Sequence, residues 1–237
     1  MNRFTRRCNG FRILRRFAAL LLIFCAPAVT AAPAELGQEQ VVAIAADQTI
    51  TLTQTGQAVL ARSYFSDAEL AQNWLAAHLL QQTLTFTPRG TDRYGRTLIT
   101  ADIEAALLRD GVAVAYGEGP MQAALLNAEA QARAAKRGVW ANPDFVLTPE
   151  QTAQHLQEFH VVEGTVRRIY RARNATYVNF GDDWKTDFSI SIVGRSRRAI
   201  TALEGLKEGS HVRARGVLFE ENGPMLRLTQ PSQLELF

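Results

Sequence analysis

The chain has 237 residues, of which 26 are lysine or arginine, 23 are aspartate or glutamate and two are cysteine. Both cysteines and six of the basic residues lie in the first 25 positions, so the rest of the chain has no thiol and a net charge of −3. This composition excludes disulfides, thiol catalysis and cysteine metal sites beyond that segment. The overall charge gives no reason to expect a nucleic-acid-binding protein.

The N-terminal segment has the organisation of a secretory signal peptide. Its arginines precede an apolar run over 17–25, and small residues follow as far as Ala34. This order is typical of export signals, and the apolar run is much shorter than the roughly 20 residues that cross a bilayer as a helix. We therefore expect residues 1–31 to be a signal peptide, cleaved between Ala31 and Ala34. This predicts a periplasmic or secreted protein with no membrane span in the mature chain.

Charge divides the remaining chain into two parts. Residues 32–159 carry 8 basic and 14 acidic side chains, whereas residues 160–237 carry 12 basic and 9 acidic ones. An Asn-Pro-Asp sequence at 142–144 interrupts the first part shortly before its end. The sequence therefore predicts a first domain over 32–145, a linker helix over 146–159 and a second domain over 160–237, each large enough to bury a core.

The first part alternates between strand and helix patterns. Short β-branched runs separated by polar turns indicate a strand meander. Ser66 and Glu69 have the spacing of a capping box, which predicts that a helix begins at Ser66, and Pro88 to Gly90 predicts a turn. The expected strands cover 41–46, 49–54, 57–64, 83–87, 96–101 and 112–116, and the expected helices begin at 66 and cover 102–109 and 121–137. This order predicts a small α+β barrel.

The second part consists mainly of strand patterns. The expected strands cover 161–169, 176–180, 187–193, 211–218, 225–228 and 234–237, and one helix is expected near 195–206. Five or so strands with one helix in the middle have the order of an OB barrel, although a different small barrel would fit the pattern nearly as well. The predicted fold class is therefore α+β to mainly β, with an OB-type barrel that carries helices followed by a second small OB-like barrel.

Three segments of the first part resemble the staphylococcal nuclease, or thermonuclease, family. The run Thr-Asp-Arg-Tyr-Gly-Arg-Thr-Leu at 91–98 is similar to the family's D-K/R-Y-G-R-x-L segment. Residues 110–116 are similar to its G-x-A-x-x-Y strand, and residues 129–140 to its closing A-E-x-x-A…G-x-W helix. The stretch 162–225 resembles a C-terminal extension of some bacterial members. The resemblance implies a nuclease-like OB-type barrel and calcium-assisted hydrolysis of phosphodiesters in DNA and RNA.

Hydrolysis of this kind needs a cation held by carboxylates, a carboxylate that activates water, and cationic donors for the charge on the phosphorane oxygens. The resemblance places Arg96 at the position of one of the family's two catalytic arginines. It offers Asp47 and Asp67 as metal ligands and Glu69 as the general base, with Arg62 as a substitute for the second arginine. An active site built from these residues would bind Ca²⁺.

The chain departs from the family pattern at most of these positions. Leu60 stands at the place of the second arginine, and Arg62 follows two residues later, a displacement of about 6.6 Å along a strand. Gln48 replaces one aspartate of the family's D-G-D-T turn. The family's D-x-P-E segment corresponds at best to residues 66–69, which lack the proline and are shifted by two positions.

The candidate site residues also have structural interpretations. Glu69 completes a capping box, and Asp67 favours a helix N-terminus without any metal. Arg96 is placed to pair with Asp92 or to bond the carbonyls of a turn. The four histidines, at 78, 155, 160 and 211, have no paired metal-binding spacing and are expected to be solvated or satisfied.

The positive surplus of the chain gathers in the second part. The candidate nucleic-acid-binding residues are Arg167, Arg168, Arg171 and Arg173, and further arginines follow at 195, 197 and 198. Aromatic residues are interleaved with them at 170, 177, 180 and 184. Aromatic platforms beside basic groups bind single strands by stacking the bases. The alternative is that the aromatics fill a core and that the arginines are solvated or pair with aspartates at 182, 183 and 187.

Three functions are compatible with these observations. The one that the altered site and the negative first domain favour is a degenerate nuclease homologue, with weak or no phosphodiesterase activity, that serves as a binding or scaffold module for an unknown envelope protein. The second is an active calcium-dependent endonuclease with a rearranged site. The third is a single-strand nucleic-acid binder that acts through the second domain. The sequence assigns no certain cofactor, and only the second function implies Ca²⁺.

Overall fold

The computed structural model describes residues 36–117, 123–193 and 203–237. The expected signal peptide and most of the helix expected near 195–206 lie outside these residues. The described residues belong to one compact unit that begins at Ala34. Within these ranges, no helix combines the length and the apolar character that a bilayer crossing requires.

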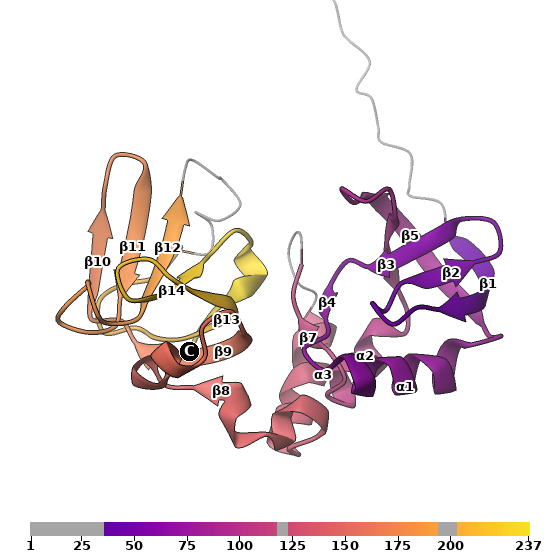
Figure 1. Ribbon diagram of the computed structural model, residues 1–237, viewed down its shortest axis with the longest axis horizontal. Coiled ribbons are helices and arrows are strands. Elements are labelled where there is room, and N and C mark those ends of the chain that lie inside the picture. The colour runs from indigo at the N-terminus through magenta and orange to yellow at the C-terminus, as the bar shows by residue number, and fades with distance from the viewer. Residues whose placement is uncertain (1–35, 118–122, 194–202) are drawn as a thin grey trace, which may run out of the picture. The chain divides into compact units, whose positions relative to one another are not determined.

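The first half forms a closed barrel whose strands follow one another in the order β1-β2-β3-β6-β5 (Figure 1). These strands are β1 (Gly37–Ile44), β2 (Ile50–Leu52), β3 (Gly56–Leu60), β5 (Thr83–Thr91) and β6 (Thr97–Ala101). All neighbours are antiparallel except β3 and β6, which are parallel. Because β1 pairs with both β2 and β5, it is the strand that closes the barrel.

Three helices accompany the barrel, namely α1 (Ala68–Leu79), α2 (Glu104–Arg109) and α3 (Ala123–Ala134). Helix α1 buries Ala71, Leu75 and Leu79, which recur every four residues and so lie on one face, against core residues of the barrel. Its N-cap is Asp67, whose carboxylate accepts the N–H of Leu70 at 2.9 Å. The prediction of Ser66 as the cap was therefore wrong by one residue.

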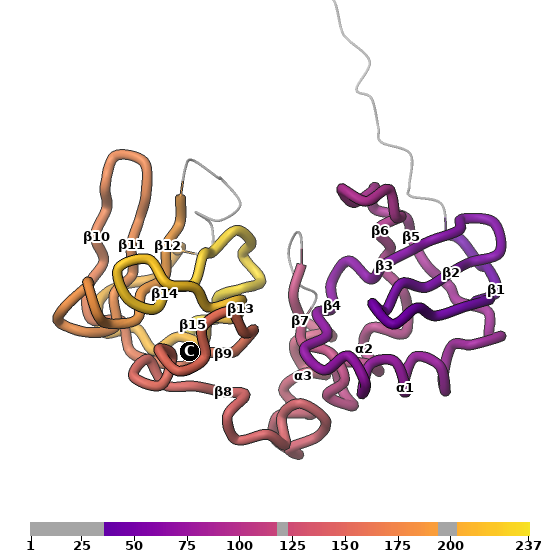
Figure 2. Tube along the Cα trace, in the orientation of Figure 1, coloured from indigo at the N-terminus to yellow at the C-terminus, as the bar shows by residue number. Residues whose placement is uncertain are grey.

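Two strand predictions in the first half need correction. The expected turn at Pro88 lies inside β5, because a β-bulge between Pro88 and Gly90 accommodates the residue that cannot donate to the ladder. The expected strand 57–64 is two strands. After β3 the chain leaves the barrel, and β4 (Ser63–Tyr64) pairs with β7 (Val114–Ala115), as the trace in Figure 2 also shows.

Two glycines make the close approach between the end of α2 and the turn after α3 possible. Gly111 has φ +68°, and a Cβ there would lie 2.1 Å from the carbonyl oxygen of Arg137. Gly138 has φ +54°, and its Cβ would lie 2.2 Å from the carbonyl oxygen of Gly111. That oxygen accepts the N–H of Val139 at 2.9 Å. Both positions therefore require glycine for space as well as for conformation.

The second half is one eight-stranded sheet in the order β10-β11-β12-β14-β13-β9-β8, with β15 added to β13. Leu147 at one end of this order and Val178 near the other belong to the same buried cluster, so the sheet curls around its own core. The expected strand 161–169 is broken after Thr165. The strands are β8 (Val146–Leu147), β9 (Phe159–Thr165), β10 (Arg168–Arg171), β11 (Ala175–Asn179), β12 (Ser189–Val193), β13 (His211–Glu220), β14 (Pro224–Arg227) and β15 (Leu234–Leu236).

The segment predicted as a linker helix over 146–159 has a different structure. It begins with β8, which pairs in parallel with β9, and continues as the 3₁₀ helix η3 (Pro149–Gln154). Thr148 and Gln151 form the capping box of η3, and Pro149 follows the cap, where its missing N–H costs no hydrogen bond. Three shorter 3₁₀ helices are η1 (Gly138–Ala141), η2 (Pro143–Phe145) and η4 (Pro231–Gln233).

A buried ion pair joins β13 to α3. Nη1 of Arg215 lies 2.8 Å from Oε1 of Glu129, and the two side chains are 0% and 1% exposed. The same guanidinium donates to the carbonyl oxygen of Ala115 at 3.0 Å, and Glu129 accepts the N–H of Ala115 at 2.6 Å. Arg215 also pairs with Glu235. Nearby, the rings of Tyr64 and Phe159 stack with centroids 3.9 Å apart.

Candidate active site

Arg96 is fixed by the tight turn that precedes β6. Oδ1 of Asp92 accepts the N–H groups of Tyr94 and of Arg96, both at 2.9 Å, which is the local hydrogen-bonding pattern that favours aspartate in turns. Oδ2 of Asp92 accepts Nε of Arg96 at 2.8 Å. The aspartate therefore holds both the backbone and the side chain of the arginine.

The same guanidinium reaches across the barrel to the turn between β1 and β2. Nη1 of Arg96 donates to Oδ2 of Asp47 at 3.0 Å and to Oγ1 of Thr49 at 2.8 Å. Hydrogen bonds from Thr49, followed by the charge of Arg96, hold the pKa of Asp47 below its usual range. One cation is thus shared between two carboxylates, and the charge of this group is negative overall.

These residues line a cavity of about 570 Å³ on the barrel. Its lining consists of Ala45, Asp47, Thr49, Gln57, Tyr94 and Arg96. The structure therefore brings together two of the predicted site residues, Asp47 and Arg96, from positions 49 residues apart in the sequence. In the structure these two side chains form an ion pair with each other.

The other three predicted site residues lie elsewhere. Asp67 caps α1 and lines a different cavity, together with Glu158 and His160. Glu69 is exposed in the first turn of α1. Arg62 lies between β3 and β4, where its N–H donates to Glu104 at 3.2 Å and its carbonyl oxygen accepts the N–H of Tyr116. Arg62, Asp67 and Glu69 are not among the residues that line the cavity of Arg96.

The donor set around Asp47 does not fit a calcium ion. Ca²⁺ takes six to eight oxygen ligands in proteins, whereas the carboxylate of Asp47 already accepts from Arg96 and from the N–H of Thr49. Gln48 has φ +60° and turns its amide back to the carbonyl oxygen of Ala46. Leu60, at the place of the second family arginine, belongs to the hydrophobic core. We therefore derive no catalytic step through a metal at this place.

Glu104 is a buried carboxyl group that sequence reasoning missed. Its side chain accepts the N–H of Arg62 at 3.2 Å and of Ala101 at 3.3 Å, and the residue is 2% exposed. Burial raises the pKa of Glu104 to about 7, although both hydrogen bonds act in the opposite direction. A glutamate at the start of an expected helix looks like an ordinary first-turn acid, so its burial could not be predicted from the sequence.

The predicted nucleic-acid-binding arginines have three different environments. Arg167 donates to Asp182 at 2.8 Å, in agreement with the alternative of pairing to an aspartate. Arg168 instead lines a cavity of about 500 Å³. Arg171 and Arg173 are exposed around the turn from β10 to β11. The three later arginines, at 195, 197 and 198, lie outside the described residues.

The cavity beside Arg168 has an aromatic lining. Tyr170 and Trp184 line it and remain 55% and 53% exposed. Tyr177 also lines it and is half-buried. Phe180 instead packs on the core residue Phe188, with ring centroids 5.1 Å apart. The remaining lining residues are Asn179, Ser189, Glu221, Asn222 and Met225.

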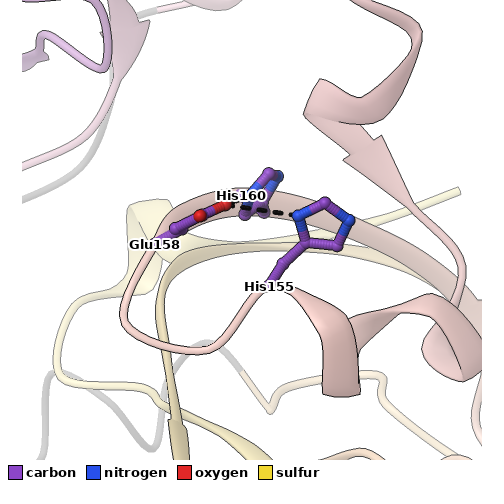
Figure 3. Close-up of side chains that lie close together, drawn as sticks. All are labelled: His155, Glu158 and His160. Atoms are coloured by element: carbon purple, nitrogen blue, oxygen red, sulfur yellow. Dashed lines mark hydrogen bonds and ion pairs between the residues drawn. The ribbon is translucent and has the colours of Figure 1, made fainter.

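The structure brings together three residues that the sequence analysis left scattered. His155, Glu158 and His160 offer one ligand atom each, all within 4.8 Å of one another (Figure 3). Both histidines are satisfied by Glu158, as expected, but their gathering with it was not predicted. The only signal for it in the sequence is the H-x-x-E-x-H spacing of residues 155–160.

A comparison with known proteins finds a family model that matches part of the first half. Residues 51–142 match the family model described as staphylococcal nuclease homologue. The match begins within β2 and ends just after η1, so β1, Asp47 and the second sheet lie outside it. No curated protein matches the chain. Residues 51–142 are thus a staphylococcal-nuclease-like domain, and the closed five-stranded barrel to which they belong is of OB type.

Proposed function

We propose that this protein is an exported nuclease-fold module that hydrolyses phosphodiesters weakly or not at all, and that it acts by binding an envelope partner. The observation that carries this proposal is the shared guanidinium of Arg96, which bonds Asp47, Asp92 and Thr49 at 2.8–3.0 Å. An arginine that stabilises a phosphorane must direct its N–H groups at the substrate. Here Nε and Nη1 are engaged by side chains of the protein itself.

The electrostatics of the cavity support the same proposal. A site that holds a polyanion needs a local positive field. The carboxylates of Asp47 and Asp92 outnumber the one guanidinium between them, and residues 32–159 carry a net charge of −6. The resemblance aligns the second family arginine with Leu60, which belongs to the hydrophobic core. These features disfavour both substrate binding and charge stabilisation.

Export is the second component of the proposal and rests on residues 1–31 alone. Their basic, apolar and small-residue order is typical of a signal peptide. The test is to express the full chain with a C-terminal epitope and to determine the N-terminus of the purified product by mass spectrometry. An N-terminus between positions 31 and 35 in the exported fraction supports export. A product that keeps residues 1–31 in the cytosol contradicts it.

The nuclease component is tested by digestion of denatured DNA and of RNA with residues 32–237, in the presence of Ca²⁺ or a chelator. The variant is Arg96→Ala, and the matched control is Arg93→Ala, which removes an exposed arginine three residues away in the same turn. We expect no calcium-dependent cleavage by any of the three proteins. Cleavage that Arg96→Ala abolishes and Arg93→Ala retains would show that the family chemistry is present and would overturn the proposal.

A second candidate function is single-strand nucleic-acid binding through the second half. The observation that favours it is the cavity lined by Arg168, Tyr170 and Trp184, which sets a cation beside two exposed aromatic rings. Stacked bases and a basic groove are the usual components of such sites. This candidate is compatible with the first one, because it uses neither Arg96 nor Asp47.

A further inference from the structure

The loop that leads into β9 gathers three ligand atoms around one point. Nδ1 of His155 lies 3.2 Å from Oε2 of Glu158, and Nε2 of His160 lies 3.0 Å from the same oxygen. Figure 3 shows both imidazole rings on the same side of this carboxylate. The ring centroids are 4.7 Å apart, at an angle of 61°.

The backbone that carries these side chains is fixed by hydrogen bonds. The N–H of His155 donates to the carbonyl oxygen of Thr152 at 3.1 Å, which ends η3. The N–H of Gln157 donates to the carbonyl oxygen of Leu218 at 2.8 Å, and the N–H of Leu218 donates to the backbone carbonyl oxygen of Glu158 at 2.9 Å. His160 is part of β9 and pairs with β13. The three ligand atoms are therefore held close together before any ion arrives.

The types of the three groups suit a transition metal. Two imidazoles and one carboxylate are an established ligand set for Zn²⁺, with water in the fourth position. Bonds of about 2.0–2.1 Å in a tetrahedron separate neighbouring ligand atoms by about 3.3 Å. The two observed nitrogen–oxygen separations of 3.0 and 3.2 Å are close to this value, and all three ligand atoms lie within 4.8 Å of one another. We propose that His155, Glu158 and His160 form a binding site for a divalent transition metal, with Zn²⁺ as the preferred ion.

The surroundings leave a fourth coordination position accessible. Glu158 and His155 have side chains that are 61% and 25% exposed, whereas His160 is 9% exposed. Glu158 and His160 also line a cavity of about 710 Å³, so water or another oxygen ligand reaches the ion from that side. The three protein ligands therefore leave the side of the site that faces this cavity open to solvent.

The second ring nitrogen of His160 determines how tightly we expect the metal to bind. Nδ1 of His160 is buried and has no hydrogen-bond partner among the described residues. A ligating histidine normally donates its second N–H to a partner, and loss of such a partner weakens metal binding by about 10–100-fold. We therefore expect an affinity in the micromolar range rather than that of a structural zinc site. This site is independent of the proposed function, because it contains none of the residues around Arg96.

The test is zinc binding by tag-free residues 32–237, freed of metal by a chelator. Equilibrium dialysis against ZnCl₂ measures the affinity and the stoichiometry, and Co²⁺ in place of Zn²⁺ reports the coordination number by its visible spectrum. The variants are His155→Ala, at a partly exposed position, and Glu158→Gln, at an exposed one. The matched control is His211→Ala, which removes an exposed histidine from β13.

We expect one Zn²⁺ per chain, four-coordinate cobalt bands, and an affinity that falls about tenfold or more in either variant and is unchanged in His211→Ala. Zinc should raise the melting temperature of the unaltered protein and of His211→Ala only, because a bound ion stabilises the folded state. Absence of stoichiometric binding at micromolar concentrations would overturn the proposal. Binding that survives both His155→Ala and Glu158→Gln would overturn it as well.

Discussion

The guanidinium of Arg96 donates to the carboxylate of Asp47 at 3.0 Å. Arg96 lies in the turn before β6, whereas Asp47 lies in the turn between β1 and β2. If the arginine is structural, Arg96→Ala should destabilise the protein by about 1–3 kcal/mol, because it leaves hydrogen-bonding partners unpaired. Asp47→Ala should cost less than about 1 kcal/mol, since its side chain is 63% exposed. Urea unfolding of the two variants measures both values. If the Arg96→Ala variant is as stable as the unaltered protein, Arg96 does not have a structural role.

The ion pair of Arg215 and Glu129 should behave differently, because both side chains are buried. Burial also lowers the pKa of Arg215, opposed by the nearby carboxylate. Glu129→Gln should cost about 3–5 kcal/mol, since it removes the more buried of the two carboxylates that pair with this buried cation. Arg215→Met combined with Glu129→Gln should cost less than the sum of the single changes.

The matched control for this cycle is the exposed pair of Arg227 and Glu221, whose side chains are 51% and 49% exposed. Removal of either partner there should cost less than about 1 kcal/mol. Chemical denaturation gives all of these free energies. Similar losses of stability for the buried and the exposed pair would contradict the interpretation that the buried pair stabilises the contact between β13 and α3.

Glu104 should make stability depend on pH near neutrality. Its folded pKa of about 7 lies above the ordinary value of 4.5, so the folded state binds the proton more tightly than the unfolded state. The resulting stabilisation is fully present below pH 4.5 and is lost as the pH rises towards 7. The loss should be on the order of 3 kcal/mol.

The measurement is the free energy of unfolding at several pH values in this window, for the unaltered protein and for Glu104→Gln. The amide does not titrate, so the variant should lack this part of the slope whatever its absolute stability. Contributions from all other titrating groups are common to both proteins and cancel in the comparison. Equal slopes for the two proteins would exclude a titrating Glu104.

Gly111→Ala should destabilise the protein by more than about 2 kcal/mol. The new Cβ would approach the carbonyl oxygen of Arg137 to 2.1 Å at φ +68°, so both the contact and the backbone conformation are unfavourable. Gly56→Ala is the control, with φ +75° but no atom within 4 Å of the new Cβ, and should cost only about 1 kcal/mol. Thermal unfolding monitored by circular dichroism distinguishes the two. Equal losses would mean that the close approach does not matter.

Nucleic-acid binding by the second half predicts a specific pattern of losses. A fluorescently labelled oligo(dT) should bind residues 32–237 at low salt, and Tyr170→Ala should weaken binding by about 1–3 kcal/mol through the loss of one stacked base. Arg168→Ala should lower the salt dependence by the equivalent of about one phosphate contact. Arg109→Ala, on α2, is the control and should have no effect. Fluorescence anisotropy measures each affinity, and the absence of binding at low salt would exclude this function.

The sequence predicted the barrel well because its strongest signals are local. The Asp92 to Arg96 turn and the glycines at 111 and 138 each fix a backbone conformation that few other residues allow, so their motifs identify the fold. Ser66 and Asp67 show the limit of such signals. Both are good helix caps, and only tertiary packing decided which of them α1 uses.

The parts that sequence reasoning missed depend on contacts between distant segments. Glu104 is buried because the backbone of Arg62, 42 residues earlier, covers it. The cluster of His155 and His160 forms because the loop before β9 bends around Glu158, and the β13 backbone holds that bend. Periodicity describes single elements and gives no information on such arrangements.

The place of β1 in the barrel has a practical consequence for anyone who trims this protein to the segment that matches the family. A fragment of residues 51–142 would lack β1, which bonds β2 on one side and β5 on the other. Two strand edges would then present unpaired backbone groups to solvent, and such edges pair with other molecules. Insoluble or self-associating material from that fragment would therefore reflect where the cut was made and would not describe the behaviour of the intact protein.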